Sequence, residues 1–274
     1  MPGTLFVVAT PIGNLEDITL RALRVLREAA VIAAEDTRRT SQLLTRHAIS
    51  TPTTSLHEHN EGKKAAVLVE RLQRGENVAL VSDAGTPTLS DPGGHLIREA
   101  IAANIRVEPI PGPSAIVAAL SASGLSTEAF TFLGFPPTRS KDRKSWFARL
   151  RAGQGTMVFF EAPHRITATL RELRAVLGDQ PVVVARELTK IHEELVRGPI
   201  TRVLARLEMP RGEYTVLVEI GRTPDFENLD ETETTSATVH RRQAMAAVAK
   251  AHGLTANQLY QAIEEAKKSV ERPI

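Results

Sequence analysis

The apolar residues in the first 110 positions follow two alternating patterns. Short runs of Val, Ile, Leu and Ala, typical of buried strands, alternate with segments whose apolar residues recur every three or four positions, typical of helices. The predicted strands are Leu5–Ala9, Val31–Ala34, Val78–Val81 and Arg106–Ile110, and the predicted helices are Asp17–Ala29, Arg39–His47, Gly62–Leu72 and Gly94–Ala103. This alternation predicts a largely parallel α/β sheet with right-handed crossovers.

After Pro111–Pro113 the alternation resumes with more strands per helix, so this sheet is expected to be mixed. The predicted strands are Phe130–Gly134, Thr156–Glu161, Val182–Arg186, Glu194–Gly198 and Glu213–Ile220, and the predicted helices are Ala115–Ser123, Lys141–Leu150 and Arg165–Leu177. The sequence therefore predicts two α/β domains, over residues 1–112 and 113–222.

The last fifty residues differ in character from the rest of the chain. Asp225–Glu233 carries five acidic residues and no basic one, which predicts an acidic linker over residues 223–236. Thr238–His252 and Ala256–Lys268 then have helical patterns separated by Gly253, so residues 237–274 are expected to form a helical hairpin. A helix-turn-helix is one form of such a hairpin, although most hairpins of this kind do not bind nucleic acid.

Composition excludes several classes of protein. The 274 residues contain no cysteine, which removes disulfides, thiolate nucleophiles and Cys-based metal sites and fits a cytoplasmic location. The chain begins directly with a predicted strand, so we expect no secretory signal. No apolar run approaches the ~20 residues that a membrane helix needs. The net charge is only +2, so local patches of charge matter more than the total.

Three predicted strands end in tight turns rich in Gly, Pro and small polar residues. The turns are TPIGN (Thr10–Asn14), SDAGTP (Ser82–Pro87) and PGPSA (Pro111–Ala115). In open α/β sheets, small ligands bind at the carboxyl ends of the strands, where such turns lie. We therefore expect the three turns to share one pocket for a small molecule.

Each turn also has a simpler interpretation. The first lacks the glycine spacing of G-x-G-x-x-G and the lysine of a Walker loop, so a classical dinucleotide or nucleoside triphosphate site is disfavoured. In the second, Asp83 can cap its own turn, accept a hydrogen bond from a ribose or attract a cation. In the third, Ser114 can cap a helix, or the N–H groups there can hold a carboxylate or an adenine edge.

Further polar residues follow other predicted strands. They lie in AEDTRRT (Ala34–Thr40), EAPHR (Glu161–Arg165) and ARELTK (Ala185–Lys190), which places polar groups from both domains on one rim. Surface ion pairs and helix caps explain such clusters equally well taken one at a time. The histidines, His57 and His59 among them, lack metal-binding spacing, so we expect no metal site. There is no G-x-S-x-G elbow, which disfavours an α/β-hydrolase.

The segment Arg139–Arg151 carries six basic residues against one acid, with Trp146 and Phe147 among them. Such a helix can contact RNA phosphates through Lys141, Arg143 and Lys144, while Trp146 stacks on an unpaired base. An amphipathic helix with Trp146 packed inward fits the same pattern.

Taken together, seven motifs closely resemble, in order, the bacterial ribosomal RNA small-subunit methyltransferase I family, a branch of the tetrapyrrole-methylase-like S-adenosylmethionine enzymes. They are VVATPIGNLEDIT (Val7–Thr19), AEDTRRT, VSDAGTPTLSDPG (Val81–Gly93), PGPSA, FLGFPP (Phe132–Pro137), EAPHR and RELTKIHEE (Arg186–Glu194). The resemblance spans roughly residues 4–221, and the C-terminal hairpin is similar to that family's appendage.

The resemblance implies a two-domain, homodimeric enzyme that binds S-adenosylmethionine between its domains. It also implies 2′-O-methylation of a cytidine in the decoding region of 16S rRNA. The residues that it places around the methyl donor are Pro11, Gly13, Asp83, Gly85, Thr86, Ser114, Ala115, Phe160 and Glu161.

A ribose hydroxyl is a poor nucleophile, so transfer to it needs a base or a group that polarises it. The candidates for this chemistry are Glu35, Asp36, Asp83, His164, Glu187 and Lys190, and the sequence does not rank them. We favour Lys190 for polarising the hydroxyl, with Glu35, Asp36 and Glu187 as further catalytic candidates. The residues expected to contact RNA phosphates are Arg38, Arg39, His164, Arg165 and Lys190.

Two alternatives stay open. One is a methylase of the same superfamily that acts on a tetrapyrrole, a corrinoid or a protein side chain. The other is a ribosome-assembly factor that binds rRNA without catalysis.

Overall fold

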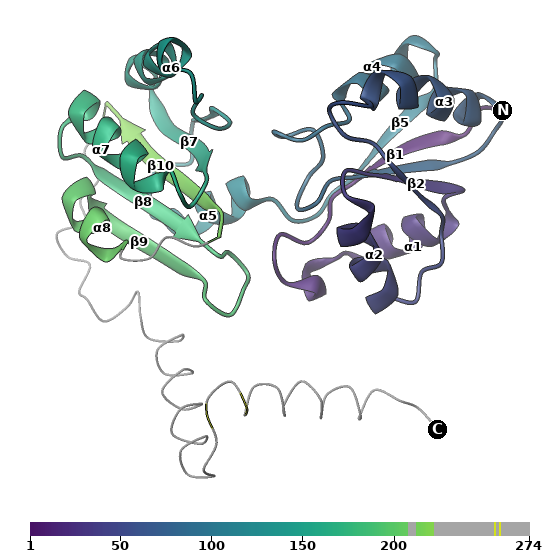
Figure 1. Cartoon of the computed structure of the whole chain (residues 1–274), viewed down its shortest axis with the longest axis horizontal. Helices are drawn as coiled ribbons and strands as arrows, with labels where there is room; N and C mark the ends of the chain where they lie inside the picture. The colour runs from purple at the N-terminus through teal and green to yellow at the C-terminus, as the bar shows by residue number, and fades with distance from the viewer. Residues whose placement is uncertain (208–211, 222–254, 256–257, 259–274) are drawn as a thin grey trace.

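The computed structural model describes residues 1–207, 212–221, 255 and 258. It contains two lobes, each built on a five-stranded sheet and joined by the segment that leads into α5 (Figure 1). The expected linker (223–236) and helical hairpin (237–274) lie outside the described residues, apart from Thr255 and Gln258. No helix among the described residues is long and apolar enough to cross a membrane.

The first sheet is parallel throughout, in the order β3-β2-β4-β1-β5. Its strands are β1 (Thr4–Val8), β2 (Val31–Ala34), β3 (Thr53–Ser55), β4 (Val78–Val81) and β5 (Arg106–Ile110). Helices cover both faces: α1 (Leu20–Glu28) and α2 (Thr37–Arg46) on one, and α3 (Glu61–Gln73) and α4 (Gly94–Ala102) on the other. Because both faces are buried, successive residues of β2 and β4 are apolar without alternation.

The second sheet is mixed, in the order β6-β7-β10-β8-β9, with β6 and β7 parallel and the other neighbours antiparallel. Its strands are β6 (Phe130–Phe132), β7 (Gly155–Glu161), β8 (Pro181–Arg186), β9 (Glu194–Pro199) and β10 (Tyr214–Ile220). The helices α6 (Ser140–Ala152), α7 (Ile166–Leu177) and α8 (Ile200–Arg206) cover one face, and α5 (Ala115–Ser123) packs on the other. The predicted parallel and mixed α/β sheets are therefore confirmed.

Several element ends differ from the prediction for local reasons. The helix α1 begins at Leu20 rather than Asp17 because the Thr19 hydroxyl accepts a hydrogen bond from Ala22 N–H and caps it, after a 3-10 turn at Leu15–Asp17. The strand β6 ends at Phe132, before Gly134, whose φ of 65° is incompatible with a strand.

Two elements have no counterpart in the prediction. Strand β3 has only three residues, all polar, and it forms because Ile32 and Ala33 of β2 pair with Thr53 and Thr54. Helix α8 has only seven residues, too few for a clear helical pattern.

Candidate functional site

The three Gly- and Pro-rich turns meet at the carboxyl edge of the first sheet, as predicted. Thr10 and Gly85 exchange two backbone hydrogen bonds of 2.9 and 3.0 Å, which join the first turn to the second. The Thr86 hydroxyl donates to Pro113 O at 3.2 Å and joins the second turn to the third. Gly85 has a φ of 82°, and a Cβ there would lie 3.3 Å from Ile12, so glycine suits this junction.

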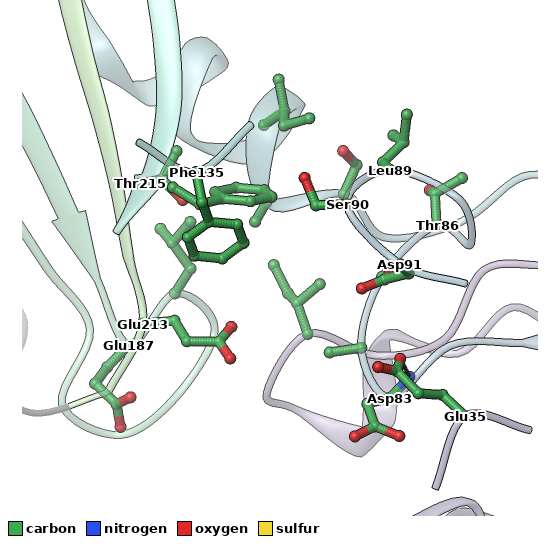
Figure 2. Close-up of a pocket in the computed structure, with 18 of the residues that line it drawn as sticks. Glu35, Asp83, Thr86, Leu89, Ser90, Asp91, Phe135, Glu187, Glu213 and Thr215 are labelled. Atoms are coloured by element: carbon green, nitrogen blue, oxygen red, sulfur yellow. Dashed lines mark hydrogen bonds between the residues drawn. The ribbon is translucent and has the colours of Figure 1, made fainter. Parts of the chain in front are cut away.

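These turns form one wall of a cleft between the two lobes, and the second lobe forms the other wall (Figure 2). The cleft has a cavity volume of about 190 Å³ and opens to solvent. Its lining residues are Ile12, Glu35, Arg39, Asp83, Ala84, Gly85, Thr86, Leu89, Ser90, Asp91, Ser114, Ala115, Ile116, Phe135, Phe160, Glu187, Leu188, Lys190, Glu213 and Thr215. A concave site between two lobes is a typical place for a small-molecule ligand.

Ten of the residues singled out from the sequence line this cleft, including residues of the second and third turns; the first turn contributes Ile12, which was not singled out. The ten are Glu35, Arg39, Asp83, Gly85, Thr86, Ser114, Ala115, Phe160, Glu187 and Lys190. Ser114 precedes α5, but its side chain forms no capping hydrogen bond with the helix. The N–H groups at the start of α5 therefore have no side-chain cap at this position, which favours the ligand-binding interpretation of the third turn.

The first-lobe wall is organised around Asp83. Its carboxylate accepts a hydrogen bond from Asp36 N–H at 2.9 Å and lies 3.4 Å from Arg39 Nη1. The Asp83 N–H donates to Glu35 at 3.3 Å. Burial raises the pKa of Glu35, and the hydrogen bond from Asp83 opposes this shift. A carboxylate with a raised pKa is the better proton acceptor, so this wall favours Glu35 as a base.

Asp36 does not line the cleft, which corrects its expected place beside the reacting groups. Its carboxylate accepts hydrogen bonds from Arg38 Nη2 at 2.8 Å and from Arg38 N–H at 2.9 Å, where it caps α2. The hydrogen bonds from Arg38 lower the pKa of Asp36 to about 2. A carboxylate held in the charged form in this way is a weak base. Arg38 is exposed and also lies off the cleft lining.

The second-lobe wall carries Glu187, Lys190 and Glu213. The Lys190 amine lies 2.9 Å from Glu187 Oε1, and both side chains line the cleft. Figure 2 shows Glu187 and Glu213 on one side of the cleft and Glu35, Asp83 and Asp91 on the other. The cleft therefore has carboxylates on both walls.

Aromatic rings form an apolar part of the same wall. The Phe160 ring lies 4.9 Å from the Phe132 ring and 5.5 Å from the Phe135 ring, measured between centroids. Phe135 and Phe160 both line the cleft, and Phe135 is 43% exposed. A planar base can pack against such rings.

Glu161 and Arg165 form an ion pair between a fully buried carboxylate and a partly buried guanidinium. Glu161 is fully buried and accepts hydrogen bonds from the Thr169 hydroxyl at 2.5 Å and from Ala162 N–H at 2.8 Å. Arg165 Nε lies 3.2 Å from its carboxylate, and Arg165 Nη2 donates to Pro136 O. This corrects the expected contact of Glu161 with the methyl donor and the expected contact of Arg165 with an RNA phosphate. Their neighbour His164 is exposed but does not line the cleft.

The basic helix α6 divides into a packed face and an exposed face. Trp146 is 2% exposed, and its Nε1 donates to Leu133 O at 3.1 Å, so its expected stacking on an RNA base is wrong. Arg143 bonds to Glu172 at 2.9 Å and to the Thr169 hydroxyl at 2.7 Å, which corrects its expected role as a free phosphate contact. Lys141 and Lys144 are exposed.

Two other residues, which were expected to border the pocket, are not among the residues that line the cleft. Pro11 is buried, and Gly13 packs against Thr189 and Lys190 of the second lobe. Sequence reasoning in turn did not single out Asp91, Glu213 and Phe135 as site residues. Asp91 lies in the motif VSDAGTPTLSDPG and Phe135 in FLGFPP, whereas Glu213 has no motif around it.

Asp91 is the cleft carboxylate whose pKa is shifted most. Burial is the main cause that raises its pKa to about 6 from its usual 3.8, the charge of Glu35 adds to this, and a hydrogen bond from Ser82 opposes it. The folded state thus holds this proton more tightly than the unfolded chain. The resulting stabilisation is complete below about pH 3.8 and is lost as the pH rises through 6.

Asp91→Asn is therefore expected to raise the melting temperature at pH 8 more than at pH 5. We expect a gain of about 2–4 °C at pH 8, a modest value because solvent screens this partly exposed group. Thermal unfolding at both pH values measures it, with Asp142→Asn on the exposed face of α6 as the control. An equal change at the two pH values would contradict the assignment.

Comparison with known proteins relates this chain to methylases. The model of the tetrapyrrole (corrin/porphyrin) methylases matches residues 4–204. The chain is 45% identical to ribosomal RNA small subunit methyltransferase I of Pseudomonas aeruginosa, over 94% of this chain and 96% of the relative. It is 43% identical to the protein of the same name from Haemophilus influenzae, over 95% and 96%.

Solved structures share the fold at lower sequence identity. A diphthine synthase superposes with a TM-score of 0.65 at 17% identity and covers 81% of this chain and 91% of its own. Uroporphyrin-III C-methyl transferase from Thermus thermophilus, complexed with S-adenyl homocysteine, gives a TM-score of 0.57 at 19% identity, over 79% and 98%.

Proposed function

Because this chain belongs to the tetrapyrrole (corrin/porphyrin) methylase family, we propose that it methylates the 2′-hydroxyl of a cytidine in 16S rRNA with S-adenosylmethionine as donor. The observation that carries the proposal is the identity of 43–45% over at least 94% of the chain to relatives named ribosomal RNA small subunit methyltransferase I. The cleft between the lobes supports it, because both walls carry groups suited to a cationic nucleoside.

The residues of the cleft fit the donor chemically. Its lining includes five carboxylates, Glu35, Asp83, Asp91, Glu187 and Glu213, against two cations, Arg39 and Lys190. An excess of carboxylates attracts a sulfonium cation. Phe135 and Phe160 offer ring faces to an adenine, and Asp83 offers an acceptor to a ribose hydroxyl. The donor supplies a methyl carbon whose bond to a positively charged sulfur breaks as the new bond to oxygen forms.

The protein's part in the reaction is positioning and proton transfer. Lys190 binds and polarises the acceptor hydroxyl, while its ion pair with Glu187 holds the amine beside the cleft. Glu35, whose pKa is raised by burial, accepts the hydroxyl proton and passes it to solvent. Holding the reacting groups in line can lower the barrier by ~7–11 kcal/mol.

The acidic cleft repels RNA phosphates, so RNA affinity must come from elsewhere on the surface. We assign it to the exposed lysines of α6, Lys141 and Lys144, and to Arg38, which is exposed and lies off the cleft lining.

The double variant Lys141→Glu/Lys144→Glu is expected to bind small-subunit RNA about tenfold more weakly at low salt and to show a smaller salt slope, since two phosphate contacts are lost. Filter binding over a range of salt concentrations measures both quantities. Lys63→Glu/Lys64→Glu on α3 is the control with the same change of charge. An unchanged slope in the α6 variant would remove this helix from the RNA surface.

Transfer of tritiated methyl tests the reaction against its alternatives. We expect label from the donor in isolated small ribosomal subunits and none in a corrinoid or in ribosomal protein. Label in a corrinoid or protein instead would favour another branch of the family. Absence of donor binding in calorimetry would favour a non-catalytic assembly factor.

The resemblance also supports a homodimer in the cytoplasm. Light scattering tests the first part, with an expected mass twice that of the chain.

A further inference from the structure

The segment that carries Lys190 has an unusual backbone. It follows β8, and two of its non-glycine residues are left-handed, Glu187 with a φ of 51° and Thr189 with a φ of 66°. A β-branched residue such as threonine rarely adopts this conformation. Such strain persists only where the surroundings hold it in place, and it is concentrated at functional sites.

Local hydrogen bonds hold this segment from within. Thr189 N–H donates to Glu193 Oε2 at 2.6 Å, and Lys190 N–H donates to Glu187 O at 2.9 Å. On one side Gly212 packs against Glu187 so closely that a Cβ on it would lie 1.8 Å from Glu187 Oε1. The Glu187 carboxylate, which pairs with the Lys190 amine, is thereby confined.

On the other side the segment contacts the first lobe. Asn14 N–H donates to the Thr189 hydroxyl at 3.0 Å, a hydrogen bond between residues 175 positions apart. A Cβ on Gly13 would lie 2.5 Å from Lys190 Cγ and 2.9 Å from the Thr189 hydroxyl. Only glycine therefore allows the first turn to come this close to Lys190.

We propose that Thr189 is a positioning residue for Lys190. Its hydroxyl ties the strained segment to the first-lobe turn, and this contact between the lobes fixes the Lys190 amine at the cleft. The inference rests on the proposed methyl transfer, in which Lys190 polarises the acceptor hydroxyl. A position that served stability alone would favour glycine, which adopts a positive φ without strain.

Three substitutions of Thr189 distinguish a role in positioning Lys190 from a role in stability alone. Thr189→Ser keeps the hydroxyl, Thr189→Val removes it and keeps the shape, and Thr189→Gly removes both the hydroxyl and the strain. Thr201→Val is the matched control, because the Thr201 hydroxyl bonds to Asp179 at 2.6 Å in the same lobe and lies off the cleft lining. We expect kcat to fall about tenfold in the Val and Gly variants, with the donor dissociation constant unchanged. We expect kcat near wild type in the Ser variant and in the control, and no loss of melting temperature in the Gly variant.

A second readout needs no RNA. The rate at which acetic anhydride modifies Lys190, followed by peptide mass spectrometry, is expected to rise several-fold in the Val and Gly variants and to stay at the wild-type value in the Ser variant. Unchanged modification of Lys190 in the Gly variant, or wild-type kcat in that variant, overturns the inference. If the wild-type protein transfers no methyl group while Lys190 modification responds as expected, the proposed function fails and the positioning by Thr189 is supported.

Discussion

Replacing Lys190 by alanine is expected to lower kcat by about 10²–10⁴-fold, the range that a positioned proton-transfer or polarising group contributes. The Lys190 amine lies at the cleft, 2.9 Å from Glu187 Oε1, and no other lysine lines the cleft among the described residues. The proposed contacts of the methyl donor are carboxylates on both walls and rings on the second-lobe wall, so its dissociation constant is expected to change little in this variant. Single-turnover transfer to small subunits and calorimetry with the donor measure the two quantities.

Lys63→Ala, on the exposed surface of α3, is the matched control and is expected to retain wild-type turnover. Glu187→Gln keeps the shape of the carboxylate while it removes the charge that holds the amine, so we expect an intermediate loss. A Lys190→Ala variant with wild-type turnover would eliminate the polarising role. A variant that instead loses donor binding would make Lys190 part of the donor site.

The second large effect concerns stability. Arg165→Met is expected to lower the free energy of unfolding by about 3 kcal/mol, because it leaves the fully buried Glu161 carboxylate without its cation. Thr169 and Ala162 N–H still bond to that carboxylate, so the loss falls at the lower end of the usual range. Urea unfolding followed by circular dichroism measures it.

A second substitution is expected to restore much of the lost free energy of unfolding. In Glu161→Gln/Arg165→Met the buried charge is gone, so most of the stability returns. Arg171→Met, an exposed arginine on the same helix α7, is the control and is expected to change the free energy of unfolding by less than about 0.5 kcal/mol. Unchanged stability of Arg165→Met together with weakened RNA binding would return Arg165 to the RNA surface.

The first-lobe wall could be predicted from the sequence because each of its turns directly follows a strand in the chain. A strand followed by a Gly- and Pro-rich turn is visible in the chain, and parallel strands bring their carboxyl ends to one edge. The turn that holds Asp83, Gly85 and Thr86 was predicted in this way, whereas the resemblance implied their contact with the methyl donor. Which side chain points into the cleft is not local, however, and Asp36 turns back to cap α2 while its neighbour Glu35 faces the ligand space.

The second-lobe wall was harder to predict from the sequence, because it depends on how segments far apart in the chain come together. Glu213 belongs to no motif, and it lines the cleft only because β10 runs between β7 and β8 in the mixed sheet. The partnership of Glu161 and Arg165 depends on how the chain turns from β7 into α7, which residue spacing does not reveal. The burial of Trp146, in contrast, could have been predicted from the sequence. With Phe147 and Leu150 it forms the apolar stripe of α6, and all three are buried.

The position of the added methyl group tests the central claim most directly. Small-subunit RNA is treated with the protein and deuterated donor, hydrolysed in alkali and analysed by mass spectrometry. Alkaline cleavage requires a free 2′-hydroxyl, so ribose methylation protects the linkage, and we predict one deuterated dinucleotide with the label on the cytidine ribose. Label on a base, or digestion to labelled mononucleotides alone, would contradict the account.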